Sequence, residues 1–278
     1  MKLQKGMRVF GSIKDISDQI LINTGVQNVH EYNGLTYFKD AYVPLQTWRS
    51  LTDVESRLLV AKRAKFSDHS KSVYVGEIPA KLKDAFQPLD LKSCTIPNEV
   101  LPKFHDNKKI VKKINKELHA FLKDLSSTGS FKFHRVTRAI ANKETISYHL
   151  MGETQTHIGL HIDQSRRFKI HTAYKSGNRI SINLSEETRT LIFTNLTLIQ
   201  IYNLLSQKID LSKTDLNPDN IAELFYIHYP DYPVVKVAIK PYQYYVAPTD
   251  NFFHDASTVG NKEIDVTIVY TGLFDQLP

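Results

Sequence analysis

The sequence predicts an α+β protein in which a partly helical amino-terminal part packs against a carboxy-terminal part built from short strands. An amphipathic helix is expected from about Asp106 to Leu125, because apolar residues recur at helical spacing and lysines occupy the opposite side. After Ser130, short β-like runs follow one another at spacings of about a dozen residues, which is typical of a β-sandwich or barrel. No linker rich in Gly, Ser or Pro divides the chain. We therefore expect one domain over residues 1–278, with 1–130 as a mixed amino-terminal part and 131–278 as a strand-rich core.

In the first hundred residues, short apolar runs alternate with polar turns. We expect strands at Met7–Phe10, Gln19–Ile22, Leu35–Phe38 and Val73–Val75. A helix is predicted over Leu51–Lys65, where Thr52 as the N-cap and Glu55 three residues later form the pattern of a capping box. The four prolines between residues 79 and 102 favour irregular, wrapping segments over long regular elements.

The carboxy-terminal part is predicted to consist of strands that two short helices interrupt. The helices are expected at Leu198–Gln207 and Ile221–Tyr226. The strands are expected at Phe131–Val136, Thr145–Leu150, Thr156–Ile162, Phe168–Ala173, Arg179–Asn183, Thr190–Asn195, Val234–Ile239, Gln243–Val246 and Asp265–Thr271.

Composition and charge narrow the classes of function. The chain is 41% hydrophobic and 23% charged, as in an ordinary globular protein, and its single cysteine, Cys94, excludes an internal disulfide. No apolar run approaches the roughly 18 residues that span a bilayer, and no apolar signal segment opens the chain. We therefore expect a cytoplasmic protein without a membrane partner. The net charge of +7 favours anionic partners but does not choose among them.

The lysines of the predicted helix raise nucleic acid as one candidate partner. These residues are Lys108, Lys109, Lys112, Lys113 and Lys116. No aromatic residue interleaves with them to stack on bases, so we interpret them as a solvated helix face and do not expect nucleic acid as a partner. The sequence also lacks a phosphate-binding G-x-x-x-x-G-K-[ST] loop, a G-x-G-x-x-G motif, a G-x-S-x-G elbow and paired cysteines for zinc.

Residues 156–168, THIGLHIDQSRRF, contain the first candidate site. If Thr156–Asp163 is a strand, side-chain alternation places His157, His161 and Asp163 on one face. An imidazole and a carboxylate two residues apart can supply two adjacent ligands of an octahedral metal ion. An H-x-D tripeptide also arises by chance. Alone it favours a structural pair in which the two side chains are hydrogen bonded to each other.

Residues 243–260, QYYVAPTDNFFHDASTVG, supply a third candidate ligand. An expected strand is followed by a polar turn that leads to His254, which comes 91 residues after Asp163. Asp255, Ser257 and Gly260 are then expected to form a turn, and the chain returns as a strand from Asp265. A surface loop could also carry this histidine. Taken with the H-x-D pair, however, it favours a site of two histidines and one carboxylate, which leaves three coordination positions open and suits non-haem Fe(II).

These motifs resemble those of the Fe(II)/2-oxoglutarate-dependent oxygenases, whose fold is a double-stranded β-helix, or jelly roll. The resemblance rests on HIDQ at 161–164, on the interrupted β region after it, and on APTDNFFHDASTVG. The stretch NRISINLSEETRTLIFTNL at 178–196 further resembles a little-characterised bacterial branch of that superfamily. The resemblance covers about residues 145–275 and none of the first hundred. It implies a jelly-roll core at 131–278, with amino-terminal helices and irregular wrapping segments around it.

The resemblance also implies roles for the three candidate ligands. His161, Asp163 and His254 would hold the iron and serve as the catalytic centre, 2-oxoglutarate would chelate the metal, and one position would remain for dioxygen. The far carboxylate of this cosubstrate needs a cation. Many family members have an Arg or Lys about ten residues after the distal histidine, but this chain has Ile264 and Asp265 there.

We expect that cation on an earlier strand, as in the JmjC-like branch. Arg179 is the first choice and Arg189 the second, although a salt bridge at the rim or a turn contact would also explain either residue. Asn183 could contact the cosubstrate or simply end its strand in a turn. Arg166 and Arg167 follow the H-x-D motif and could pair with an anionic substrate, or be ordinary surface arginines.

The predicted function is hydroxylation of a C–H bond in a small polar metabolite, anionic or zwitterionic, such as an amino acid or a natural-product intermediate. Asp163 favours hydroxylation over halogenation, because halogenases of this superfamily have a small residue in place of the carboxylate ligand. Two alternatives remain open. One is a cupin-type metalloenzyme that does not use 2-oxoglutarate, which the missing late arginine favours. The other is a basic nucleic-acid-binding module in which the His/Asp pair is structural.

Overall fold

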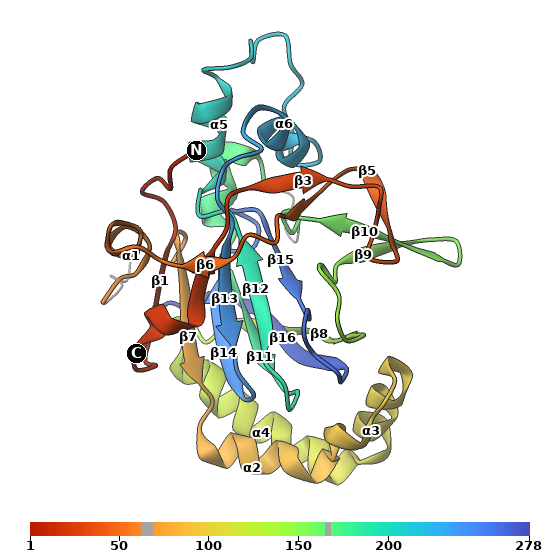
Figure 1. Cartoon of the computed structure of the whole chain (residues 1–278). Coiled ribbons are helices and arrows are strands. Elements are labelled where there is room, and N and C mark those ends of the chain that lie inside the picture. The colour runs from red at the N-terminus through yellow and green to blue at the C-terminus, as the bar shows by residue number, and fades with distance from the viewer. Residues whose placement is uncertain (63–68, 165–167) are drawn as a thin grey trace.

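Two β-sheets face each other and enclose an apolar core (Figure 1). The computed structural model describes residues 1–62, 69–164 and 168–278. The first sheet, here the major sheet, has six strands in the order β1-β7-β14-β11-β16-β8. Its strands are β1 (Arg8–Gly11), β7 (Ser72–Glu77), β14 (Gln243–Ala247), β11 (Asn178–Asn183), β16 (Asp265–Gly272) and β8 (Phe131–Ala139).

The second sheet, here the minor sheet, has five strands in the order β15-β12-β13-β2-β6. Its strands are β15 (His254–Ser257), β12 (Arg189–Phe193), β13 (Val235–Ile239), β2 (Ile20–Ile22) and β6 (Arg49–Ser50). A further sheet, here the side sheet, has the order β3-β5-β10-β9, with β4 paired to β5. Its strands are β3 (Val26–Asn28), β4 (Glu31–Tyr32), β5 (Leu35–Pro44), β9 (Tyr148–Met151) and β10 (Thr154–Gly159).

The helices are α1 (Asp53–Leu59), α2 (Ala80–Phe86), α3 (Val100–Asp106), α4 (Lys108–Asp124), α5 (Leu198–Leu205) and α6 (Ile221–His228). In Figure 1, α5 and α6 lie at the top, α2, α3 and α4 lie at the bottom, and α1 lies at the left. Helices α2 and α4 share one apolar cluster with strands β11, β14 and β16 of the major sheet. Helices α5 and α6 share a second cluster with β3 and β5, so they lie at the opposite end of the molecule.

Side-chain alternation decides which residues of the major sheet face its helices. On β11, Ile180 and Ile182 pack outward with Leu118 and Leu122 of α4. The alternate position, Arg179, therefore points to the inner side, toward the minor sheet. The inner side of the major sheet thus carries the polar residues of β11, and this is where a site can form.

The chain crosses between the two facing sheets in the order expected for a jelly roll. Strands β8, β11, β14 and β16 belong to the major sheet, whereas β12, β13 and β15 belong to the minor sheet. His161, just after β10, makes an antiparallel bridge to His254 at the start of β15, which places this segment beside the minor sheet. The arrangement is a double-stranded β-helix. It confirms the predicted fold class, α+β with a jelly-roll core.

Strands from the first eighty residues extend both facing sheets, although the resemblance covered none of them. In the major sheet, β1 pairs in parallel with β7, and β7 pairs with β14. In the minor sheet, β2 pairs with β13, where Ile22 lies opposite Val235. The amino-terminal part therefore supplies strands to both of the sheets that hold the candidate site.

The two predicted amino-terminal helices are present, with one difference in length. Helix α4 confirms the amphipathic helix, and Thr52 and Glu55 form the predicted capping box at the start of α1. The prediction that this second helix continues to Lys65 is wrong, because α1 ends at Leu59. Val60 is extended and bridges Val9 of β1, so the chain leaves the helix to pair with the major sheet.

Three strand predictions around the candidate site are corrected by the structure. The predicted strand Phe168–Ala173 is a 3-10 helix, Ile170–Lys175, whose buried residues Ile170 and Ala173 are three apart. The strand predicted to run from Thr156 past residue 160 ends at Gly159. The segment after His254, expected to turn, is strand β15. Across the described ranges, every helix is too short or too polar to cross a bilayer.

Candidate metal centre

Gly159 sets the position of the first two candidate ligands. Its φ is +72°, and a Cβ at this position would lie 2.4 Å from the carbonyl oxygen of Tyr42 on β5. Only glycine fits both constraints without strain. The register of β10 against β5 shifts between His157 and Gly159, and the chain then leaves β5 for β15. His161 and Asp163 therefore lie in a segment that crosses toward the minor sheet, not on a regular strand.

His254 lies directly opposite His161. The amide of His161 donates to the carbonyl of His254 at 3.1 Å, and the amide of His254 donates to the carbonyl of His161 at 2.8 Å. Strand β15 also pairs with β12, where Phe193 lies opposite His254. Because Phe193 belongs to the core between the facing sheets, the His254 side chain points to the same inner side.

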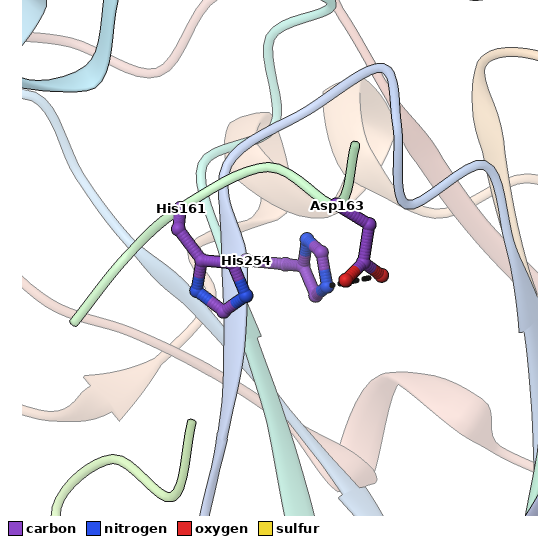
Figure 2. A group of neighbouring side chains, drawn as sticks. All are labelled: His161, Asp163 and His254. Atoms are coloured by element: carbon purple, nitrogen blue, oxygen red, sulfur yellow. Dashed lines mark ion pairs between the residues drawn. The ribbon is translucent and has the colours of Figure 1, made fainter. Parts of the chain in front are cut away.

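The three side chains converge on one point, as Figure 2 shows. One ligand atom from each of His161, Asp163 and His254 lies within 4.8 Å of the other two. The Nε2 atom of His254 lies 3.4 Å from Oδ2 of Asp163. A single cation could therefore contact all three residues.

Hydrogen bonds to the far nitrogens orient both imidazole rings. His161 donates from Nδ1 to the carbonyl of Gly159 at 2.8 Å, which leaves Nε2 as its free ligand atom. His254 Nδ1 lies 3.3 Å from the carbonyl of Phe252. Burial lowers the pKa of His161, so its ring is neutral at pH 7, as a metal ligand must be.

The carboxyl group of Asp163 is held in its ionised form. Burial by itself raises the pKa of Asp163, but His254 and the guanidinium of Arg179 outweigh it and hold the pKa well below its usual range. Oδ2 lies 3.0 Å from a terminal nitrogen of Arg179. Even so, this buried atom receives no well-aligned hydrogen bond from any residue that the structure describes. A cation bound here would satisfy it.

The donor set therefore fits a divalent transition metal. Two imidazoles and one carboxylate, all oriented to one side, match the facial arrangement that non-haem Fe(II) prefers and leave other coordination positions to small molecules. This fit rests on the Asp163 oxygen, which lacks a well-aligned hydrogen bond within the described residues, and on the orientation of the two histidines.

Asp255 lies behind the site and was not singled out in the sequence. It follows His254 on β15 and lies opposite Ile192, so it points to the outer side of the minor sheet. Its Oδ1 accepts a hydrogen bond from Ser147 Oγ at 2.9 Å, and its Oδ2 lies 4.0 Å from Nδ1 of His161. A carboxylate beside the far nitrogen of a metal-binding histidine stabilises the ring orientation and makes the ring a better ligand. In the sequence, the one signal for Asp255 is its place next to His254, since neighbouring residues of a strand point to opposite faces.

Arg179 reaches the centre, as its contact with Asp163 shows, and Thr271 lies opposite it on β16. The hydroxyl of Thr271 is buried and has no hydrogen-bond partner in the described ranges. Both residues border a narrow gap of about 10 Å³. The guanidinium of Arg179 and the unused hydroxyl of Thr271 therefore lie together next to the candidate ligands.

Arg189 and Asn183, the other residues expected to contact a cosubstrate, lie at the far end of the barrel. Arg189 donates to Thr267 and lies 3.1 Å from Asp265, and this arginine is only 4% exposed. The Asn183 amide bridges the carbonyls of Glu187 and Ile239, both at 2.9 Å. These contacts engage both side chains at the ends of the sheets, and their role toward a cosubstrate stays a prediction. Arg166 and Arg167 lie outside the described residues.

A second pair of residues near the centre had no sequence motif to reveal it. On β8, Arg135 Nε donates to Nε2 of His134 at 2.7 Å. Burial and the charges of Arg179 and Arg135 lower the pKa of His134 to about 4. Arg135 lies opposite Val269 of β16, between residues that pack outward with the helices, so it points to the inner side of the major sheet, as Arg179 does.

Comparison with known proteins gives a limited result. No protein-family model matches the chain, and no curated protein matches it. Solved structures that match include the apo form of the Kdo hydroxylase KdoO, a non-heme Fe(II) alphaketoglutarate dependent dioxygenase, with 14% identity and a TM-score of 0.36 over 75% of this chain and 82% of that chain. KdoO in complex with alphaketoglutarate and Fe(III) matches with 15% identity, the same TM-score and the same coverage. Likenesses this distant carry no functional argument, so the site itself must carry the proposal.

Proposed function

We propose that this protein is an Fe(II)/2-oxoglutarate-dependent oxygenase that hydroxylates a C–H bond of a small polar metabolite. The observation that carries the proposal is the convergence of His161, Asp163 and His254 on one point between the facing sheets. Iron and 2-oxoglutarate bound together supply the oxidising chemistry that such a hydroxylation needs. The protein would contribute the facial array of ligands and the orientation of the substrate.

The environment of Arg179 supports 2-oxoglutarate as the cosubstrate. In the metal-free arrangement, its guanidinium neutralises the buried carboxylate of Asp163 at 3.0 Å. Once a cation takes over that role, Arg179 can turn to a second carboxylate, and the unused hydroxyl of Thr271 can donate to the same group. The gap of about 10 Å³ between them is too small for the cosubstrate, so its binding requires these side chains to shift.

The role of each ligand follows from its surroundings. His161 and His254 would each present Nε2 to the metal, because backbone carbonyls lie beside their Nδ1 atoms. Asp163 occupies the position of the carboxylate ligand, so no site for a halide is left among the protein ligands. This favours hydroxylation over halogenation as the reaction.

The proposal is tested by anaerobic spectroscopy on metal-free protein. We expect that Fe(II) followed by 2-oxoglutarate produces the weak visible charge-transfer band of the chelate. Arg179→Gln should still bind iron but require about tenfold more 2-oxoglutarate for the band, because a charge-assisted pair to the carboxylate is lost. Arg138→Gln, on the outer side of β8 opposite Val266, is the matched control and should behave as wild type.

Each other outcome has a distinct meaning. Iron binding without a band at any 2-oxoglutarate concentration would refute the cosubstrate and favour a cupin-type metalloenzyme. Equal 2-oxoglutarate dependence in wild type and Arg179→Gln would refute the role of this arginine while leaving the iron site intact.

A further inference from the structure

The edge of the major sheet beside the metal centre carries an arginine on its inner side. Strand β8 is the last strand of that sheet. Arg135 lies opposite Val269 of β16, and the neighbours of Val269 pack outward with the helices. Val269 and Arg135 therefore point inward, as does the Arg179–Thr271 pair two residues further along β16. The side chain of Arg135 is exposed, so a ligand from solvent can reach it.

A β-bulge brings His134 to this arginine. The register of β8 against β16 shifts between Val269 and Tyr270, which leaves His134 as the extra residue. Bulges re-aim side chains and are frequent next to active sites. Here the bulge lets Nε2 of His134 accept the hydrogen bond from Nε of Arg135, which fixes the plane of the guanidinium. The two terminal NH2 groups of Arg135 remain available to a ligand.

Charges around the pair are mostly positive. Burial and the positive charges of Arg179, Arg135 and Lys132 lower the pKa of His134, and the negative charge of Asp163 raises it. The carboxylate of Asp163 already contacts His254 and Arg179 at the candidate metal centre. No carboxylate of the described residues forms an ion pair with Arg135, so its charge is left without a paired carboxylate at the edge of the major sheet.

On the inner side of the sheets, Fe(II), the Asp163 carboxylate, the two carboxylates of 2-oxoglutarate and Arg179 would together sum to zero. Asp255 lies on the outer side of the minor sheet, so none of the inner groups needs Arg135 as a counter-ion. We propose that Arg135, oriented by His134, binds a carboxylate or phosphate group of the substrate and so selects anionic small molecules for hydroxylation. This inference rests on the proposed function, because the balance assumes that the metal and cosubstrate are bound. Terminal guanidinium nitrogens suit two oxygens of one such group.

The inference is tested with inorganic phosphate as the probe and Mn(II) in place of iron. Protein loaded with Mn(II) and saturated with 2-oxoglutarate is mixed with phosphate, and paramagnetic enhancement of the ³¹P relaxation rate reports phosphate held near the metal. We expect a saturable enhancement in wild type. In Arg135→Gln the concentration of phosphate for half saturation should rise about tenfold or more. Arg138→Gln, whose side chain lies on the outer side of the same strand, should match wild type.

A second variant separates orientation from charge. His134→Gln removes the ring that fixes the guanidinium but leaves Arg135 charged, so we expect weaker phosphate binding than in wild type and stronger binding than in Arg135→Gln. Mn(II) and 2-oxoglutarate affinities, measured on the same samples, should stay unchanged in both variants.

The outcomes distinguish the inference from the function on which it rests. Normal Mn(II) and 2-oxoglutarate binding with no phosphate enhancement, or with equal enhancement in Arg135→Gln and Arg138→Gln, would overturn the anion site alone. Failure of wild type to bind Mn(II) would overturn both the anion site and the oxygenase proposal.

Discussion

Gly159 is the residue on which the geometry of the metal centre depends most, so its replacement by alanine is the most informative perturbation. A Cβ at this position would lie 2.4 Å from the Tyr42 carbonyl oxygen, a backbone atom that cannot move without disturbing β5. The positive φ of +72° adds strain of its own. The carbonyl of Gly159 also accepts the hydrogen bond that orients His161.

Gly152 provides a matched control for the size of the effect. Its φ is +66°, but a Cβ there would meet nothing within 4 Å. Gly152→Ala should therefore lower the free energy of unfolding only by the strain of a left-handed residue, about 1–2 kcal/mol. Gly159→Ala should add the steric clash, for a total of about 3 kcal/mol. It should also weaken Fe(II) binding about 10- to 100-fold, because the orientation of a ligand histidine is lost.

Two measurements on the same samples check this prediction. Urea unfolding gives the free energy of unfolding, and competition with a chromophoric chelator gives the Fe(II) affinity. If Gly159→Ala matches Gly152→Ala in both measurements, then neither the close approach to Tyr42 nor the carbonyl of Gly159 positions His161, and the reasoning is wrong.

Three further predictions concern charged groups around the barrel. Asp255→Asn should weaken Fe(II) affinity about tenfold in the chelator assay, because its carboxylate lies 4.0 Å from His161 Nδ1; unchanged affinity would contradict this. Replacing Arg189 by Met should lower the free energy of unfolding by about 3–5 kcal/mol, because the buried carboxylate of Asp265 loses its ion-pair partner. Fe(II) binding should persist. Arg49 and the helix cap lower the pKa of Glu55 from 4.5 to about 2, so this carboxylate stabilises the fold above pH 4.5 and loses that effect as pH falls toward 2. Glu55→Gln should therefore cost about 1 kcal/mol at pH 7 in urea unfolding and less at pH 3.5, and a difference that does not shrink would refute it.

The sequence predicted well where the signal is local. The apolar stripe of α4 and the Thr52–Glu55 capping box depend on residues three or four apart, and both are present. The three candidate ligands were also identified, because an H-x-D pair and a distal histidine are visible as motifs.

Features that depend on contacts distant in sequence were missed. Alternation along one regular strand was expected to place His157 beside His161, but the shift at Gly159 separates them. His157 instead packs against Tyr37, with ring centroids 5.4 Å apart. A glycine within a strand often marks a bulge, which is the signal that could have revealed the break.

The same limit applies to the residues around the ligands. Strand β15 and its Asp255 were missed because the strand is short and follows a polar turn. The pairing of β2 with β13 joins residues more than two hundred positions apart. Arg135 and His134 lie side by side because of a β-bulge against β16, and no local sequence pattern predicts this bulge.

The most direct test of the metal centre is the stoichiometry of Fe(II) binding, measured by anaerobic calorimetry on metal-free protein. We expect one tightly bound ion in wild type, and its loss in each of His161→Ala, Asp163→Ala and His254→Ala. His149→Ala, which removes an exposed histidine on β9, should bind as wild type does. Circular dichroism should first show that the three ligand variants are folded. If they still bind one ion with wild-type affinity, the convergence of these side chains is structural, and the proposed function is refuted.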